Sequence, residues 1–372
     1  SGKYQLHELL ERPVNIQSPE LIIVDLKEEL KQYPVKEHIM LSSRLSTAIE
    51  KCLTFNEQVI LFQNKRGYSS YLHCIDCGQI SDCPNCSISL VYHKADNQLI
   101  CHFCGHKEAI SNKCPSCKSE NLKLSGFGTQ KIEELLRQHF PHARVMRMDS
   151  DTTRKKDGHR LILQQFESGE VDILIGTQMI SKGLDFPNVT LVGVLNADLS
   201  LSIPDFRAAE RSFQLISQVA GRAGRGEKAG HVIIQTFQPD HYAVQAAVAN
   251  NFKQFYAIES HLRQDIFYPP FSRLINIRIS SENEGQVFES ISEFSNQLNR
   301  LIGDSIDLLG PVPCPIERIN RKYRWQLLLK IKSSVDSPQF ELKQKLMHVK
   351  EFLLKKFNSI HVAIDVDPYD LI

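Results

Sequence analysis

Residues 58–62 read Gln-Val-Ile-Leu-Phe, and the run is apolar throughout after its first residue. Such a run is typical of a strand that is buried on both faces of a parallel sheet, because a half-exposed strand alternates polar and apolar residues. Comparable strand signals recur along the chain with helix-like segments between them. They are residues 21–25, 143–148, 171–176, 189–195 and 231–235. This alternation predicts an α/β domain in which helices cover a parallel sheet.

The size and charge of the chain narrow its class. Its 372 residues are enough for two to three domains. The 44 basic and 43 acidic residues leave a net charge of +1, so any surface for nucleic acid must be local. No apolar run reaches the roughly 18 residues of a membrane span and no secretory leader opens the chain, so we expect a cytoplasmic protein without a membrane partner.

Eight of the ten cysteines fall between residues 74 and 117 as four C-x-x-C pairs. This spacing lets the two thiolates of one tight turn bind a single tetrahedral zinc ion. Eight thiolates complete two such sites and leave no open position, which predicts two structural zinc ions. A disulfide framework is the alternative, but it requires an oxidising compartment. The pairs are Cys74/Cys77, Cys83/Cys86, Cys101/Cys104 and Cys114/Cys117.

Loop lengths favour a nested pairing of these cysteines. Strand-like residues 89–92 and 98–100 lie between the second and third pairs, as in a zinc-ribbon hairpin. The first and fourth pairs would then close over that hairpin. A sequential pairing stays open as the alternative, with a loop of five residues between Cys77 and Cys83. Cys52 and Cys314 are expected to be buried thiols without a ligand role.

The sequence pattern changes near residue 250. From there the order is strand, helix, strand, strand, helix, strand, with helices near 283–302 and 338–357. This order predicts a compact α+β domain. We therefore divide the chain into a leading linker, a discontinuous α/β domain, a zinc module inserted into it and a C-terminal domain. The boundaries are 1–20, then 21–71 with 118–250, then 72–117, then 251–372.

Three polar clusters are expected at the carboxyl ends of strands, where open parallel sheets bind ligands. In residues 126–131 a glycine turn leads into a helix, whose N-terminus can hold an anion. In residues 176–187, Thr177 and Lys182 suit a phosphodiester and Asp185 suits a sugar hydroxyl. In residues 218–226, Arg222 and Arg225 share one helical face and present forks that match phosphate oxygens. The alternative for each cluster is an ordinary polar loop or helix end.

These clusters resemble motifs of superfamily 2 helicases. Gln218-Val219-Ala220-Gly221-Arg222-Ala223-Gly224-Arg225 looks like motif VI, residues 176–187 look like motif V, and residues 126–131 with 144–152 look like motif IV and its surroundings. With the cysteine-rich insertion, and residues 207–214 leading into motif VI, the chain resembles bacterial primosomal replication-restart helicases over residues 3–372. The resemblance implies a RecA-like second motor lobe, an inserted double zinc ribbon and a small α+β C-terminal domain.

The resemblance also implies roles for single residues. Arg222 and Arg225, supported by Gln218, would be catalytic residues that sense ATP. Thr177 and Lys182 would bind the DNA backbone, while Gly183 and Asp185 would bind nucleotide and couple it to DNA. The family's cysteine pairing is the nested one, and its translocation is 3′→5′. The first zinc would be held by Cys74, Cys77, Cys114 and Cys117, and the second by Cys83, Cys86, Cys101 and Cys104.

The resemblance assigns the C-terminal domain to forked and single-stranded DNA. Arg321, Lys322 and Trp325 would contact DNA, since basic and aromatic side chains together suit a strand with stacked bases. Lys322 and Gln326 would bind the acidic tail of the single-stranded-DNA-binding protein. The family often has arginine at the position of Lys322. Other primosome proteins are expected as partners, in a nucleoid-associated setting.

Two elements of a motor ATPase are absent from the sequence. It contains no G-K-[ST] phosphate cradle and no Asp-Glu dipeptide for a Walker B element. We therefore expect the chain alone not to hydrolyse ATP, and ATP with Mg²⁺ to act in the full-length enzyme. Two alternatives remain: a zinc-ribbon scaffold that binds nucleic acid or partners without catalysis, and another DNA translocase of superfamily 2.

Overall fold

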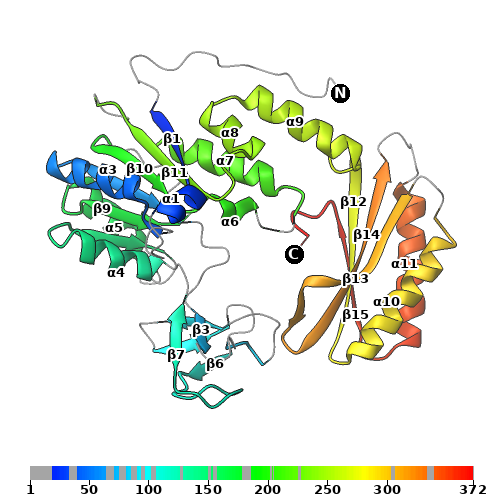
Figure 1. The fold of residues 1–372 in the computed structure, drawn as a ribbon. Helices are drawn as coiled ribbons and strands as arrows, with labels where there is room; N and C mark the ends of the chain where they lie inside the picture. The colour runs from blue at the N-terminus through cyan, green and yellow to red at the C-terminus, as the bar shows by residue number, and fades with distance from the viewer. Residues whose placement is uncertain are drawn as a thin grey trace. The chain divides into compact units, whose positions relative to one another are not determined.

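The computed structural model divides into two compact units. The first unit comprises Ser1–Tyr68, Phe127–Ser202 and Ala209–Phe255, and the second comprises Ser69–Gly126, Ile203–Ala208 and Tyr256–Ile372. The residues that the structure describes are 19–32, 40–63, 71–74, 81–84, 90–93, 97–101, 106–125, 129–149, 152–153, 157–177, 186–201, 203, 205–224, 228–302, 306–332 and 339–371. Figure 1 shows their helices and strands.

The first unit contains a six-stranded parallel sheet in the order β1-β11-β10-β2-β9-β8. The predicted parallel sheet is therefore confirmed, and the apolar run of residues 58–62 forms one of its inner strands. The strands are β1 (Glu20–Asp25), β2 (Gln58–Phe62), β8 (Val145–Met148), β9 (Ile173–Gly176), β10 (Val189–Val194) and β11 (His231–Thr236).

Helices cover both faces of this sheet. Val59 and Leu61 of β2 pack into one apolar cluster with residues of α3 and α4, while Ile60 and Phe62 pack into another with residues of α5, α7 and α8. Two-sided burial explains why β2 lacks polar alternation. The helices of this unit are α1 (Leu26–Gln32), α3 (Ser43–Thr54), α4 (Thr129–His139), α5 (Gly158–Glu167), α6 (Asp198–Leu201), α7 (Ala208–Ala220) and α8 (Tyr242–Val248), followed by α9 (Phe252–Asp265), which continues into the second unit.

The second unit holds the cysteine-rich module and the C-terminal domain. The module has a pair of strands, β3 (Tyr71–Cys74) and β7 (Leu122–Ser125), and a three-stranded sheet of β4 (Val91–His93), β5 (Gln98–Ile100) and β6 (Lys107–Ala109). The pairing of β4 with β5 is antiparallel. The hairpin predicted between the second and third cysteine pairs is therefore present.

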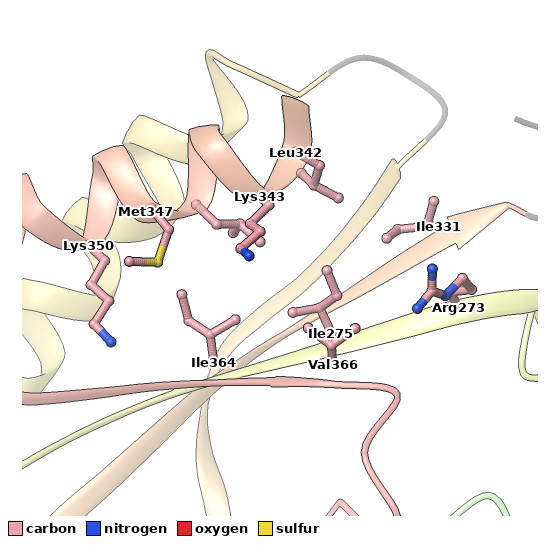
Figure 2. Close-up of a pocket in the computed structure, with 10 residues that line it drawn as sticks. Arg273, Ile275, Ile331, Leu342, Lys343, Met347, Lys350, Ile364 and Val366 are labelled. Atoms are coloured by element: carbon pink, nitrogen blue, oxygen red, sulfur yellow. The ribbon is translucent and has the colours of Figure 1, made fainter. Parts of the chain in front are cut away.

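The C-terminal domain has the predicted element order. Its antiparallel sheet runs β13-β14-β12-β15, and two helices pack on one face through a shared apolar core. A cavity of about 380 Å³ lies between α11 and that face (Figure 2). The elements are β12 (Ser272–Ser281), α10 (Glu284–Asn299), β13 (Ile306–Ile319), β14 (Lys322–Lys332), α11 (Gln339–Lys356) and β15 (His361–Val366). Across the described part of the chain, no helix combines the length and apolar character that crossing a membrane requires.

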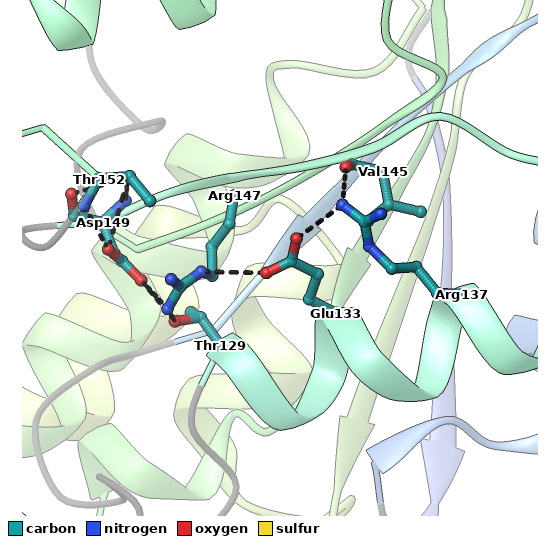
Figure 3. Close-up of polar contacts among 7 residues, drawn as sticks. All are labelled: Thr129, Glu133, Arg137, Val145, Arg147, Asp149 and Thr152. Carbon is teal, nitrogen blue, oxygen red and sulfur yellow. Dashed lines mark hydrogen bonds and ion pairs between the residues drawn. The ribbon is translucent and has the colours of Figure 1, made fainter. Parts of the chain in front are cut away.

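A buried ionic network fixes the start of α4 against the end of β8. Arg147 lies between two carboxylates, 2.9 Å from Asp149 and 3.2 Å from Glu133 (Figure 3). Thr129, the first residue of α4, donates its hydroxyl to Asp149 at 2.7 Å. Asp149 also accepts from the backbone N–H of Thr152 at 3.1 Å. Helix, strand and the turn after the strand are thus held by one carboxylate that is 1% exposed.

We predict that Asp149→Ala lowers the free energy of unfolding of the first unit by about 3 kcal/mol, because it removes one partner of a buried ion pair. Urea-dependent amide hydrogen exchange in β8 and β9 reports on this unit alone. Asp240→Ala, at an exposed position, is the matched control and should change stability by less than about 0.5 kcal/mol. Equal stability of the two variants would contradict the role given to the network.

Candidate functional site

The predicted arginine cluster lies where α7 ends. Val219 and Ala223 are buried in the core, Gln218 is exposed and Arg222 is half-buried. The backbone N–H of Gly224 donates to the carbonyl of Val189, the first residue of β10, at 3.1 Å. The end of α7 is therefore fixed to the amino-terminal edge of the sheet.

This placement corrects one expectation. The three clusters were predicted at the carboxyl ends of strands, but Gln218 and Arg222 lie at the opposite edge. The physical reason is that α7 links two parallel strands and runs back across the sheet, so its C-terminal end reaches the edge where the next strand begins. Thr177 does follow the carboxyl end of β9, and Thr129 meets Asp149 at the carboxyl end of β8.

The motif V segment connects these two edges. It leaves the carboxyl edge at Thr177, which is 6% exposed, and re-enters the described structure at Phe186, shortly before β10 begins at the amino edge. Among the residues predicted to bind nucleotide or DNA, four lie outside the described residues: Lys182, Gly183, Asp185 and Arg225. Their roles stay predictions.

In the loop after α7, two backbone segments lie very close together. Gly224 has a φ of +70°, and a Cβ atom added to Gly230 would lie 2.4 Å from the carbonyl carbon of Ala223 and from the backbone nitrogen of Gly224. Only glycine at position 230 allows the two backbone segments to lie this close. The loop that follows Arg222 is thus closed onto the start of β11.

In the cysteine-rich module, ligands of the second predicted zinc lie together. Cys83 and Cys101 are both buried in one small cluster with Leu90 and Leu99. No disulfide joins any of the cysteines that the structure describes, Cys52, Cys83, Cys101, Cys114, Cys117 and Cys314. Cys77, Cys86 and Cys104 lie outside the described residues, and of Cys74 only the backbone is described. Two cysteines in one small cluster suit a shared metal ion.

The pairing of β3 with β7 brings the segments that carry the first and fourth cysteine pairs next to each other. Cys74, at the end of β3, pairs with Leu122, at the start of β7. The turn that precedes Leu122 begins at Cys114, which accepts from the N–H of Lys118 at 3.0 Å and donates its own N–H to Ser119 at 2.8 Å. This register brings the chain of the first cysteine pair to the chain of the fourth, as a nested arrangement requires.

In the C-terminal domain, Arg321 occupies the tip of the β13–β14 hairpin. Ile319 pairs with Lys322, so Asn320 and Arg321 form a two-residue turn, with φ values of 51° and 66°. Two left-handed residues suit the tight hairpin turn whose twist matches its strands. Arg321 and Lys322 are both exposed at this tip.

The basic and aromatic stretch of β14 is divided between two faces of the sheet. Alternation places Lys322 and Gln326 together on the face without helices. Trp325 points to the helix-covered face, where it is half-buried in the core and meets Phe288 at 5.1 Å in an edge-to-face contact. The structure thus places Lys322 and Gln326 on one face of the sheet and Trp325 on the other.

Sequence reasoning missed two features of this region. Arg278 of β12 lies opposite Gln326 in the strand register and on the same face, where it forms an ion pair with Asp365 at 3.7 Å. The sequence signal for Arg278 was the alternation of β12, in which polar residues alternate with isoleucines. Arg318 donates to the carbonyl of Pro84 at 2.9 Å, and Ile319 packs on the cluster that contains Cys83. The hairpin next to Arg321 therefore contacts the cysteine-rich module.

Two family models match the chain. The model described as "Primosomal protein N C-terminal domain" matches residues 264–369, and that described as "PriA DNA helicase Cys-rich region (CRR) domain" matches residues 83–108. Together with the helix-covered parallel sheet, these matches assign the chain to the class of primosomal proteins that carry a cysteine-rich region. The chain belongs to the PriA family of replication restart proteins.

Curated relatives match nearly the whole chain. Replication restart protein PriA of Bacillus subtilis is 44% identical over 99% of this chain and 45% of its own length. The Synechocystis protein of the same name is 42% identical over 97% of this chain and 43% of its own length. That of Haemophilus influenzae is 36% identical over 100% of this chain and 49% of its own length. The chain spans about half the length of these relatives.

Solved helicase structures align with part of the chain. The Hef helicase domain of Pyrococcus furiosus is 20% identical over 60% of this chain and 30% of its own, with a TM-score of 0.28. RecG bound to a three-way DNA junction is 12% identical over 69% of this chain and 26% of its own, with a TM-score of 0.32.

We predict that Gly230→Ala lowers the free energy of unfolding of the first unit by about 1–3 kcal/mol, since the added methyl group must separate two backbone segments. Amide exchange in β10 and β11 measures the loss. Gly221→Ala is the matched control, because a Cβ atom there would make only ordinary contacts of 3.6 Å or more. Unchanged protection in Gly230→Ala would refute the close approach.

Proposed function

We propose that this chain is the C-terminal part of an ATP-dependent 3′→5′ DNA helicase that recognises stalled or forked DNA and initiates primosome assembly in replication restart. The observation that carries the proposal is the fixed end of α7, with Arg222 beside the loop that Gly224 and Gly230 close. An arginine held at the edge of a motor lobe can reach a phosphate bound by another part of the protein.

The nucleotide roles rest on the resemblance to superfamily 2 motifs, and the fixed end of α7 supports the role of Arg222. Arg222 and Arg225 would stabilise charge on the γ-phosphate, because guanidinium forks match phosphate oxygens and keep their charge. Gln218, one helical turn before Arg222, would support them. In the full-length enzyme, ATP and Mg²⁺ would be bound mainly by another motor lobe. Gly183 and Asp185 would couple that nucleotide to DNA.

The DNA roles are assigned to both units. Thr177, at the carboxyl edge of the parallel sheet, and Lys182 would contact the DNA backbone. Arg321 and Lys322, exposed at a hairpin tip, would add positive charge for a fork. Trp325 would contribute base stacking from its half-buried position. Lys322 and Gln326, on one face with Arg278, would receive the acidic tail of the single-stranded-DNA-binding protein, and other primosome proteins would also bind.

The cysteines fit two structural zinc sites with nested pairing. Cys83 and Cys101 share one buried cluster and would bind with Cys86 and Cys104. The register of β3 and β7 favours a second site built from the outer pairs, Cys74, Cys77, Cys114 and Cys117. Bound zinc would link strands too short to hold a core, so its contribution is to folding.

We predict that the chain extended through its own gene hydrolyses ATP and that forked DNA stimulates this activity. Arg222→Ala and Arg225→Ala should each reduce the stimulated kcat at least about 10³-fold, the range found for arginine fingers. The chain of residues 1–372 alone should not hydrolyse ATP. Steady-state assays with forked, single-stranded and duplex DNA measure these activities.

Arg160→Ala is the matched control, because this exposed arginine lies on α5, outside the three clusters. An extended chain that is inert on every DNA would favour the zinc-ribbon scaffold. Activity without preference for forks would favour another superfamily 2 translocase.

A second prediction concerns the thiols. Native protein should release two zinc ions per chain to a chelator, and eight thiols should then react with a disulfide reagent. Burial raises the pKa of the Cys52 and Cys314 thiols, so both should react only after unfolding. Protection of only four thiols by zinc would contradict two Cys₄ sites. Equal reactivity of all ten thiols would contradict them as well.

A further inference from the structure

The C-terminal domain has a groove on the face of its sheet that carries the helices. Lys343, Met347 and Lys350 reach from one stripe of α11 toward the strands (Figure 2). Opposite them, Ile364 and Val366 of β15 form part of the floor. The cavity of about 380 Å³ is large enough for one or two aliphatic side chains.

The floor is apolar and accessible, and the rim is positive. Met347 is 41% exposed and Val366 is 53% exposed, although both are apolar side chains of the kind that a core normally buries. Arg273 at one end is neutralised by Asp367 at 2.5 Å. Within the described residues, neither Lys343 nor Lys350 forms an ion pair or a hydrogen bond. Two uncompensated ammonium groups therefore border exposed aliphatic surface.

The groove also borders an open sheet edge. The strand order ends at β15, which pairs only with β12 among the described strands. An edge strand presents unpaired N–H and C=O groups, and an extended peptide can satisfy them by adding a strand. Because side chains alternate, every second residue of such a peptide would point toward the groove.

We infer that this groove binds an acidic peptide segment of a partner protein, extended along β15 with aliphatic side chains in the cavity and carboxylates at Lys343 and Lys350. Single-stranded DNA is also anionic, but none of the lining side chains is aromatic, so the groove offers bases no stacking surface. The site lies on the opposite face of the sheet from Lys322 and Gln326. It goes beyond the proposed function and does not require motor activity.

The test uses the whole chain and a fluorescent eight-residue peptide with aspartate or leucine at every second position and serine between them, so that both kinds of side chain can face the groove. Anisotropy should show binding, whereas peptides with serine for leucine or lysine for aspartate should bind at least about tenfold more weakly. Lys343→Glu with Lys350→Glu, and separately Met347→Asp, should each weaken binding about tenfold. Lys343→Gln with Lys350→Gln removes the charges with less perturbation. Lys355→Glu, on the same helix outside the groove, is the matched control and should bind normally.

Position is measured by amide exchange. Bound peptide should slow exchange in residues 361–366, which a contact on the opposite face would not do. Three results would overturn the inference: no binding at about 1 mM peptide, equal binding by both double variants, or loss of binding only in Lys322→Glu. Lysine-dependent binding of an oligothymidylate in place of the peptide would assign the groove to nucleic acid and also overturn it.

Discussion

The burial of the parallel strands on both faces is the constraint on which the first unit depends. Because β2 contributes Val59 and Leu61 to one core and Ile60 and Phe62 to the other, helices must cover both sides, and each crossover must return across the sheet. This return places Thr177 at one edge of the sheet and Arg222 at the other. The proposed DNA contact of Thr177 and the proposed phosphate contact of Arg222 would therefore lie at two opposite edges of one sheet.

The residues that directly precede α7 contact the C-terminal end of the chain. Arg207 donates to the carbonyls of Pro368 at 2.9 Å and Tyr369 at 2.7 Å, Phe206 stacks on Tyr268 with ring centroids 4.9 Å apart, and Asp205 accepts from the N–H of Leu371 at 3.2 Å. These three consecutive residues belong to the second unit, although α7 carries the arginine cluster of the first. The C-terminal residues thus contact the segment that leads directly into α7, the helix whose end precedes Arg222.

The sequence allowed the parallel sheet, the cysteine hairpin and the C-terminal element order to be predicted, because each depends on local periodicity or spacing. It did not allow the edge of the sheet reached by Arg222 to be predicted correctly, since that depends on the direction in which a helix returns. The network of Arg147 and Asp149 was equally hidden, because these residues look like ordinary charges near a strand end. Tertiary pairing, which no local pattern encodes, determined both.

The division of β14 between two faces shows how such pairing changes a functional interpretation. Residues 321–326 look like one continuous surface for DNA and an acidic tail, yet strand alternation sends Trp325 to the core side and Lys322 and Gln326 to the other. The open face gains Arg278 from the neighbouring strand, while the helix side gains Lys343 and Lys350 from α11. One four-stranded sheet thereby presents basic side chains on two opposite faces. The two proposed anionic partners would therefore not compete for the same lysines.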